Sequence, residues 1–331
     1  MSAPTSQLEY GLEFNGRAVV LSEKQSEPIK SDEIRLRAEV SHVSIGTEIA
    51  YIEELGKKNQ PTGLGYAMVG VIEELGTGVH DFTRGQRVLA YVNHRSASNV
   101  QVVPGALTPV PEKLSSEKAV LAVLGAIAYH IVQRAAPKLN EPTVVFGQGV
   151  VGSLIAQVAR LCGVNPIVVD TDAERLRVAR AVGFQTIDAS REDCVARVKE
   201  LTQGRGASLC IEAATNARAI GDAMKCLGMR GRLALTSTIF DPVGFLILED
   251  FIERELTVLG AHAPKCPKEP NPYYLWTQLE NRQAFMQAVC DGKLNVDHLV
   301  SHVVKPAEAP ALYERLRAKD RSIVGMEIDW R

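Results

Sequence analysis

A glycine-spaced turn stands in the middle of the chain, between an apolar run and a segment with helical periodicity. The run TVVF, residues 143–146, leads into GQGVVG and then into SLIAQVARLCG. In a G-x-G-x-x-G turn the first glycine permits a tight bend, and the second lets backbone amides approach a pyrophosphate. The third allows close packing of helix on strand. The sequence therefore predicts a dinucleotide phosphate site at Gly147, Gly149, Val150, Val151 and Gly152.

An acidic residue follows at the spacing that such a site requires. Asp170 ends the run PIVVD, 18 residues after Gly152. A carboxylate there accepts hydrogen bonds from the adenosine ribose hydroxyls and repels a 2′-phosphate. Thr171 and Asp172 offer no arginine for a 2′-phosphate, so the pattern favours NAD(H) over NADP(H). The alternative is a structural glycine turn followed by a surface aspartate.

The pattern of apolar and turn-forming residues changes near residue 120. Residues 1 to about 118 contain short β-branched runs separated by Gly, Pro and Asp, typical of a compact all-β domain. After that, unbroken apolar runs alternate with helical periods, which predicts a doubly wound parallel α/β sheet. We expect boundaries at 1–122, 123–263 and 264–331, with the last segment packing back on the first domain.

Composition narrows the partners. A net charge of −2 gives no general attraction to nucleic acid or anionic membranes, and no apolar run is long enough to span a bilayer. The six cysteines form no C-x-x-C pair, and the first residues do not resemble a signal peptide. We expect a cytoplasmic protein whose partner is a small-molecule substrate.

Four stretches together resemble the medium-chain dehydrogenase/reductase superfamily of alcohol and polyol dehydrogenases. They are IGTE at 45–48, GLGYAMVG at 63–70, LGTGVHDFTRGQRV at 75–88, and the glycine turn with its acid. The resemblance implies an α/β protein with a GroES-like β-barrel domain and a doubly wound Rossmann domain that binds NAD. It also implies a homodimer, since the apolar strand LTVLGA pairs with its twin in relatives; the same strand could instead be covered internally.

The chain departs from the zinc-dependent members at their metal ligands. Those members carry C-G-T-D and G-H-E, and the matching residues here are Ile45, Tyr66 and Ala67, with Val123 at a further ligand position. Zinc binds thiolate, imidazole and carboxylate, which these side chains lack. The pattern resembles zinc-free branches, such as the group with a GTE motif or the quinone and enoyl reductases, and predicts no metal.

Without a metal, an alcohol–ketone enzyme needs a proton donor or acceptor beside the substrate oxygen. Tyr66 occupies a zinc ligand's position, and Thr47 matches the hydroxyl residue of the zinc enzymes' proton relay. Further candidates are Glu48, which could bind substrate or only anchor backbone, and His94, which could be a surface-loop residue. Tyr66 could equally be an aromatic that fills the space vacated by zinc.

These observations predict an NAD-dependent, zinc-independent oxidoreductase that interconverts a secondary alcohol and a ketone on a polar, sugar- or cyclitol-like molecule. Two alternatives remain open. One is a reductase of an activated carbon–carbon double bond, of the quinone or enoyl reductase type. The other is a non-catalytic Rossmann protein that senses the NADH/NAD ratio.

Overall fold

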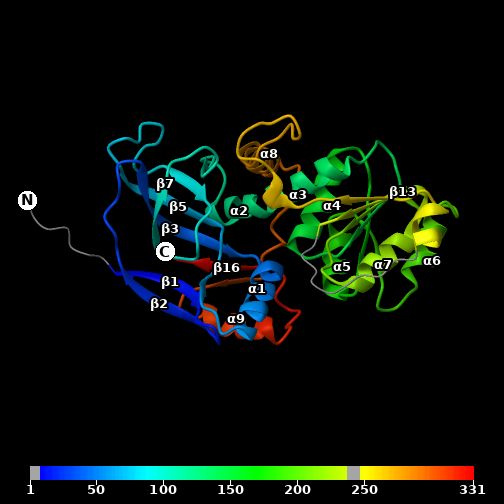
Figure 1. Ribbon diagram of the computed structural model, residues 1–331, viewed down its shortest axis with the longest axis horizontal. Helices are drawn as coiled ribbons and strands as arrows, with labels where there is room; N and C mark the ends of the chain where they lie inside the picture. Colours follow the sequence, from blue (N-terminus) through cyan, green and yellow to red (C-terminus); the bar gives the residue numbers. More distant parts are fainter. Residues whose placement is uncertain (1–7, 237–246) are drawn as a thin grey trace, which may run out of the picture. The chain divides into compact units, whose positions relative to one another are not determined.

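The computed structural model describes residues 8–236 and 247–331, and these divide into two compact units (Figure 1). Of these residues, the first unit holds 8–123, 277–290 and 300–331, and the second holds 124–236, 247–276 and 291–299. This division differs from the predicted boundaries in one respect. Residues 264–276 and 291–299 pack with the second unit, whereas we expected all of 264–331 to return to the first domain.

The second unit is built on a parallel sheet of six strands in the order β11-β10-β9-β12-β13-β14. Numbered from its first strand, that order is 3-2-1-4-5-6, the doubly wound arrangement of dinucleotide-binding folds. The strands are β9 Thr143–Phe146, β10 Ile167–Asp170, β11 Gln185–Asp188, β12 Ala207–Glu212, β13 Leu227–Leu235 and β14 Thr257–Gly260. The helices are α3 Ala122–Ala135, α4 Val150–Leu161, α5 Ala173–Ala181, α6 Cys194–Leu201 and α7 Ala217–Cys226, with short turns at Ile247–Ile252 and Ala263–Lys265.

The first unit is mainly β, as its β-branched runs predict. A seven-stranded sheet has the order β15-β16-β3-β5-β6-β8, with β7 also paired to β3, and a three-stranded sheet has the order β2-β1-β4. The strands are β1 Leu8–Phe14, β2 Val19–Gln25, β3 Glu33–Val43, β4 Thr62–Gly63, β5 Met68–Leu75, β6 Arg87–Ala90, β7 Ala97–Gln101, β8 Leu107–Pro109, β15 His302–Val304 and β16 Met326–Asp329. The helices are α1 Ile45–Lys57, α2 Ser116–Val120, α8 Gln278–Cys290 and α9 Ala309–Arg317.

Helix α1 is the feature of this unit that the strand-only reading of residues 1–118 misses. It begins directly after β3, with Ser44 as its N-cap residue and Glu48 as the acid of its first turn. Ile45, Ile49 and Ile52 recur at helical spacing and pack into one apolar cluster with the side chains of β1 and α9. The IGTE motif therefore lies in the first turn of a helix, where its side chains point in several directions.

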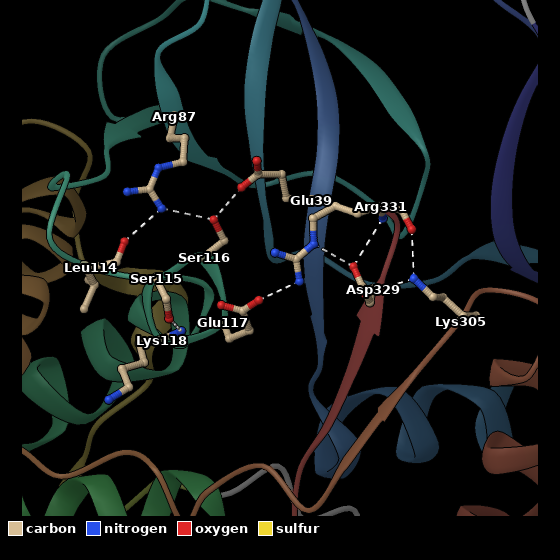
Figure 2. Close-up of polar contacts among 10 residues, drawn as sticks. All are labelled: Glu39, Arg87, Leu114, Ser115, Ser116, Glu117, Lys118, Lys305, Asp329 and Arg331. Carbon is tan, nitrogen blue, oxygen red and sulfur yellow. Dashed lines mark hydrogen bonds and ion pairs between the residues drawn. The ribbon is translucent and has the colours of Figure 1, made fainter.

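The late strand β16 lies between β15 and β3, one strand in from an edge of the large sheet. It pairs antiparallel with β3 and parallel with β15, so in Figure 1 the red strand lies beside the blue one. Polar contacts fix its end to α2, as Figure 2 shows. Arg331 Nη2 lies 2.6 Å from Glu117 Oε1, and Arg331 Nε lies 2.8 Å from Asp329 Oδ1. These contacts tie residues more than 200 positions apart into one unit.

Among the described residues, no helix is both long and apolar enough to cross a bilayer.

Candidate active site

The glycine turn after β9 has two packing glycines and one open one. Gly147 has a φ of +89°, and a Cβ there would lie 2.7 Å from the Ala213 carbonyl oxygen. A Cβ on Gly152 would collide with the Gly147 carbonyl oxygen. A Cβ on Gly149 would have no neighbour within 4 Å. The outer glycines are therefore required by the protein's own packing, and space remains in front of the middle one for a ligand.

Helix α4 begins at this open glycine. Gly149 is its N-cap residue and contributes no side-chain acceptor, so Val150 and Val151 start a helix without a capping side chain. Backbone amides at such a terminus, together with the helix dipole, favour a bound anion. The residues present therefore fit the pyrophosphate of a dinucleotide.

Asp170 lies where the sequence places it, at the end of β10, and it organises the backbone around the turn. Its Oδ2 accepts from the Gln148 amide at 2.6 Å, and its Oδ1 accepts from the amides of Thr171 and Asp172 at 2.7 and 2.9 Å. A carboxylate offers about four acceptor positions, so capacity for a further donor remains. The residue links the phosphate turn to the strand on which a ribose would lie.

Arg175 is a residue near Asp170 that the prediction from Thr171 and Asp172 does not include. It stands in the first turn of α5, and its Nη1 is 3.9 Å from Asp170 Oδ2. Its buried Nε has no hydrogen-bond partner within the described residues. A cation therefore does stand beside the predicted ribose site, contrary to the expectation that no arginine is available there.

In the first unit, Tyr66 lies against two hydroxyl groups from the start of α1. Its phenol lies close enough to the side-chain hydroxyls of Ser44 and Thr47 for both to influence its ionisation. Burial raises the pKa of Tyr66 to about 12, the neighbouring Ser44 hydroxyl opposes that rise, and the charge of Glu48 adds to it. The phenol is therefore held in its neutral form, as a proton donor, while Tyr66 and Thr47 both keep part of their surface exposed.

Glu48 is buried next to Ser44. Its Oε1 accepts from the Ser44 amide at 2.8 Å, and its Oε2 accepts from the Tyr313 hydroxyl at 2.7 Å. Burial alone would raise the pKa of Glu48, but the facing His94 and these hydrogen bonds outweigh it, so the pKa is lowered. The structure thus favours the backbone-anchoring alternative for Glu48 over direct contact with a substrate.

His94 is also buried, so the surface-loop alternative for it is wrong. It is fully covered, with Nε2 at 3.3 Å from Glu48 Oε2 and Nδ1 at 2.8 Å from Ser41 Oγ. Ser41 Oγ in turn accepts from the Trp330 indole N–H at 2.9 Å. A continuous buried chain therefore runs from Trp330 through His94 and Glu48 to Tyr313.

The loop that carries Tyr66 is fixed to His94 by close packing. Gly65 has a φ of +83°, and a Cβ there would stand about 2.5 Å from three atoms of the His94 ring. The His94 amide donates to the Leu64 carbonyl at 2.8 Å, and Asn93 Nδ2 donates to the Gly65 carbonyl at 3.0 Å. Glycine at 65 therefore lets the tyrosine loop approach the imidazole.

The positions of the relatives' zinc ligands do not fit a zinc ion. Ile45 and Ala67 offer no donor atom, and the phenol of Tyr66 is held neutral by its surroundings. Among the described residues, no three or more His, Cys, Asp or Glu side chains are placed to hold a metal ion. Because zinc prefers thiolate, imidazole and carboxylate, the chemistry of this donor set is unsuited to it.

The structure brings the four predicted residues of the first unit into one cluster and adds others that the sequence analysis did not name. Ser44 could have been noticed, since it directly precedes the IGTE motif and is a typical N-cap residue. Ser41, Tyr313 and Trp330 could not, because their contacts with the cluster depend on the pairing of β3 with β16 and on the packing of α9 against α1.

The known proteins that the chain resembles in sequence are named as dehydrogenases. The family described as zinc-binding dehydrogenase matches residues 150–277. An uncharacterised zinc-type alcohol dehydrogenase-like protein of Haemophilus influenzae is 29% identical over 211 residues, which cover 63% of this chain and 57% of that protein. The D-guloside 3-dehydrogenase of Escherichia coli is 25% identical over 327 residues, covering 90% of this chain and 92% of that enzyme.

Among solved structures, the 2R,3R-butanediol dehydrogenase of Bacillus subtilis superposes with a TM-score of 0.81 at 18% identity, over 97% of this chain and 99% of that one. This confirms the predicted fold class, a GroES-like domain with a Rossmann domain. The chain is thus similar in sequence to zinc-type alcohol dehydrogenase-like proteins and to sugar dehydrogenases, and the superposition shows that it shares their fold.

Proposed function

We propose that the protein is an NAD-dependent oxidoreductase that interconverts a secondary alcohol and a ketone without zinc. The observation that carries the proposal is the neutral phenol of Tyr66, held by Ser44 and Thr47 where relatives keep a metal ligand. A metal-free carbonyl reductase needs a positioned proton donor, and this cluster provides one.

The second unit supplies the residues that would hold the cofactor. The amides of Gly149, Val150 and Val151 would bind the pyrophosphate, and Asp170 would accept from the ribose hydroxyls. When bound, the nicotinamide ring gives or accepts the hydride. NAD is favoured because Asp170 repels a 2′-phosphate, but Arg175 opposes that preference at a distance of 3.9 Å from the carboxylate.

Proton transfer would belong to the first unit. In ketone reduction, the Tyr66 hydroxyl donates its proton to the substrate oxygen as that oxygen gains charge. The hydroxyls of Ser44 and Thr47 then stabilise the phenolate by donating to it. Glu48 and His94 do not reach the substrate in this scheme; they hold the Ser44 backbone and the tyrosine loop in place.

A polar substrate is favoured by two considerations. The hydroxyl groups of Tyr66 and Thr47, both on partly exposed residues, can bind a substrate that carries several hydroxyls of its own. The similar proteins act, by their names, on a guloside and on a butanediol. We infer a small polyol or sugar derivative that presents a secondary alcohol.

The arginine beside Asp170 favours a second candidate. A reductase of an activated carbon–carbon double bond also needs no zinc and can use a neutral proton donor. Since Arg175 could bind a 2′-phosphate, the second candidate function is an NADPH-dependent enone reductase.

Stopped-flow measurements separate these candidates. NADH and NADPH are each mixed with a panel of hydroxyketones and with a panel of enones, and loss of nicotinamide absorbance is followed. We expect turnover with NADH and hydroxyketones. Turnover confined to NADPH and enones would establish the second candidate, and binding without turnover on either panel would point to a sensor.

Metal analysis tests the zinc-free part of the proposal. We expect well below one zinc per chain, and a chelator should leave hydroxyketone reduction unchanged. Stoichiometric zinc whose removal abolishes turnover would refute it.

Cofactor preference tests the ribose contacts. The native protein should bind NADH about 10²-fold more tightly than NADPH, because charge repulsion and the lost ribose contact together reach a few kcal/mol. Asp170→Ser should narrow this ratio, and Arg175→Ala should widen it. Equal affinities in the native protein would contradict the assignment.

A further inference from the structure

Two thiols meet in the core of the second unit, far apart in sequence. Cys194 is the first residue of α6 and Cys226 is the last residue of α7. The Cys226 thiol donates to the Cys194 carbonyl oxygen at 3.9 Å, and the two thiols lie close enough to influence each other's ionisation. Both belong to the same apolar cluster beside the parallel sheet. The fold therefore places two oxidisable sulfur atoms side by side.

The two thiols differ in access to solvent. Cys194 lines a surface pocket of about 370 Å³. The other residues around this pocket are polar or charged for the most part, and they include Ser190, Arg191, Arg218 and Asp222. Cys226 is fully covered. A small polar reagent that enters the pocket can therefore reach Cys194. Cys226 does not line the pocket and lies behind Cys194.

The two thiols also differ in acidity. The neighbouring Cys226 thiol lowers the pKa of Cys194 against the opposing effect of burial, and a place in the first turn of a helix favours a thiolate further. Cys226 donates its proton to the Cys194 carbonyl oxygen. Because Cys194 is also the cysteine that lines the pocket, it is the nucleophile of the pair.

We propose that Cys194 and Cys226 form an oxidative modification site at which a hydroperoxide is the oxidant and an intramolecular disulfide is the product. This assignment is independent of the proposed dehydrogenase activity, since it involves neither the phosphate turn nor Tyr66.

The chemistry balances in two steps. The Cys194 thiolate attacks a peroxide oxygen, the O–O bond breaks, and the leaving hydroxide takes a proton to form water, which leaves a sulfenic acid on Cys194. The sulfur of Cys226 then attacks that of Cys194. The S–O bond breaks, and the departing hydroxide takes the Cys226 proton to form a second water. Two thiols are oxidised by two electrons, and one peroxide is reduced to two waters.

The remaining cysteines provide internal comparisons. Cys210 is buried on β12, and burial raises the pKa of its thiol, so it should stay inert. Cys162 is exposed at the end of α4, but burial of its sulfur still raises its pKa. If exposure alone decided reactivity, Cys162 would react first. If the thiol pair decides it, Cys194 will.

Peptide mapping of the native protein tests the proposal without any variant. Purified, reduced protein is treated with hydrogen peroxide at neutral pH, free thiols are alkylated, and the digest is analysed by mass spectrometry. We expect a linked peptide pair that joins Cys194 to Cys226, formed at least about tenfold faster than any oxidation of Cys162. Faster oxidation of Cys162, or a Cys194 that stays unlinked, would overturn the proposal.

Variants separate the two steps. In Cys226→Ser, the sulfenic acid on Cys194 should persist long enough to be trapped by dimedone, whereas the native protein should give little adduct. The Cys194→Ser protein should form no disulfide with Cys226, and Cys162→Ser, the matched control, should form the native link at the native rate. Equal dimedone trapping in the native and Cys226→Ser proteins would show that Cys226 does not resolve the intermediate.

Discussion

The four candidate residues of the first unit form two pairs that differ in burial and in their proposed roles. Tyr66 and Thr47 keep exposed surface, whereas Glu48 and His94 are 5% and 0% exposed. The sequence could indicate that these residues lie together, because their motifs match those of a known family. It could not show which side chains face outward. The Tyr313 hydroxyl that fixes Glu48 lies 265 residues further along the chain.

Removal of the Tyr66 hydroxyl should abolish most of the activity while leaving the fold intact. Tyr66→Phe keeps the ring's packing and deletes only the proton donor, so kcat for ketone reduction should fall by about 10²–10⁴. Cofactor affinity and thermal unfolding should stay native. Tyr51→Phe, at an exposed tyrosine of helix α1, is the matched control and should keep native turnover. Near-native kcat in Tyr66→Phe would reduce the residue to a packing role.

The raised pKa of Tyr66 predicts that the two directions of the reaction respond differently to pH. A phenol with a pKa of about 12 stays protonated through the working range, so ketone reduction should be flat between about pH 6 and 9. Alcohol oxidation needs the deprotonated phenolate and should rise with pH over the same interval. The rate of hydride transfer is measured in both directions, in single turnovers. An oxidation rate that does not change with pH would remove Tyr66 as the proton acceptor.

Gly65 should tolerate no side chain. Gly65→Ala introduces a Cβ about 2.5 Å from the His94 ring at a φ of +83°, so both strain and collision are expected. The free energy of unfolding should fall by about 1–3 kcal/mol, and kcat should fall with it as the tyrosine loop shifts. Gly85→Ala, at a similar φ but in open space, isolates the cost of backbone strain. Equal losses in the two variants would show that contact with His94 is unimportant.

At the scale of secondary structure, the strands and the Rossmann alternation could be predicted because each carries its own period. The runs TVVF, PIVVD and LTVLGA each correspond to a strand of the parallel sheet. Helix α1 was missed because a short amphipathic segment among strands offers a weak periodic signal. The place of β16 between β15 and β3 was beyond prediction, since strand pairing depends on partners nearly 300 residues apart.

That pairing creates a buried polar pair whose cost can be measured. His42 and Glu327 face each other across β3 and β16, with Nδ1 and Oε1 separated by 3.7 Å and both side chains 1% exposed. Neither carboxylate oxygen has a hydrogen-bond partner within the described residues. Burial raises the pKa of Glu327, and His42 only partly offsets this. The carboxylate form is therefore a liability to the folded state.

The sign of the effect follows from proton linkage. A carboxyl whose pKa is raised by folding binds its proton more tightly in the folded chain, so its contribution to stability is best below the unfolded pKa of about 4.3. That contribution is lost as pH rises through the folded pKa. Glu327→Gln should therefore gain about 1 kcal/mol near pH 7.5 and nothing at about pH 4.

Urea unfolding at the two pH values measures this difference. Glu74→Gln, at an exposed position of β5, is the control and should change stability little at either pH. A loss of stability in Glu327→Gln near pH 7.5 would mean that His42 is charged and needs its partner.

At the scale of the whole molecule, one sheet edge suggests self-association. β14 ends the parallel sheet and pairs only with β13 within the described residues, and Val258 on it is 37% exposed. An uncovered apolar edge strand is a template for pairing with a second copy. We propose a homodimer formed through this edge.

Sedimentation tests this assembly with a matched pair of variants. Val258→Lys places a charge on the β14 edge and should shift the native dimer toward monomer. Val303→Lys places the same charge at an exposed valine of β15, an edge strand of the other unit, and should leave the dimer intact. A native monomer, or equal effects of both variants, would contradict a β14 interface.

The interrupted layout of the first unit also has a consequence for how the chain is made. The ribosome releases β1 to β8 first, yet β16, which pairs with β3 on the side away from β5, is synthesised after all of unit two. Until then the edge of β3 next to Ser41 and His42 lacks its neighbour, and Trp330 cannot reach Ser41. The strands and helices of the second unit are consecutive in the chain, so this unit can fold while translation continues. In nascent chains halted before residue 326, the second unit should thus resist protease, whereas the first unit should be cleaved.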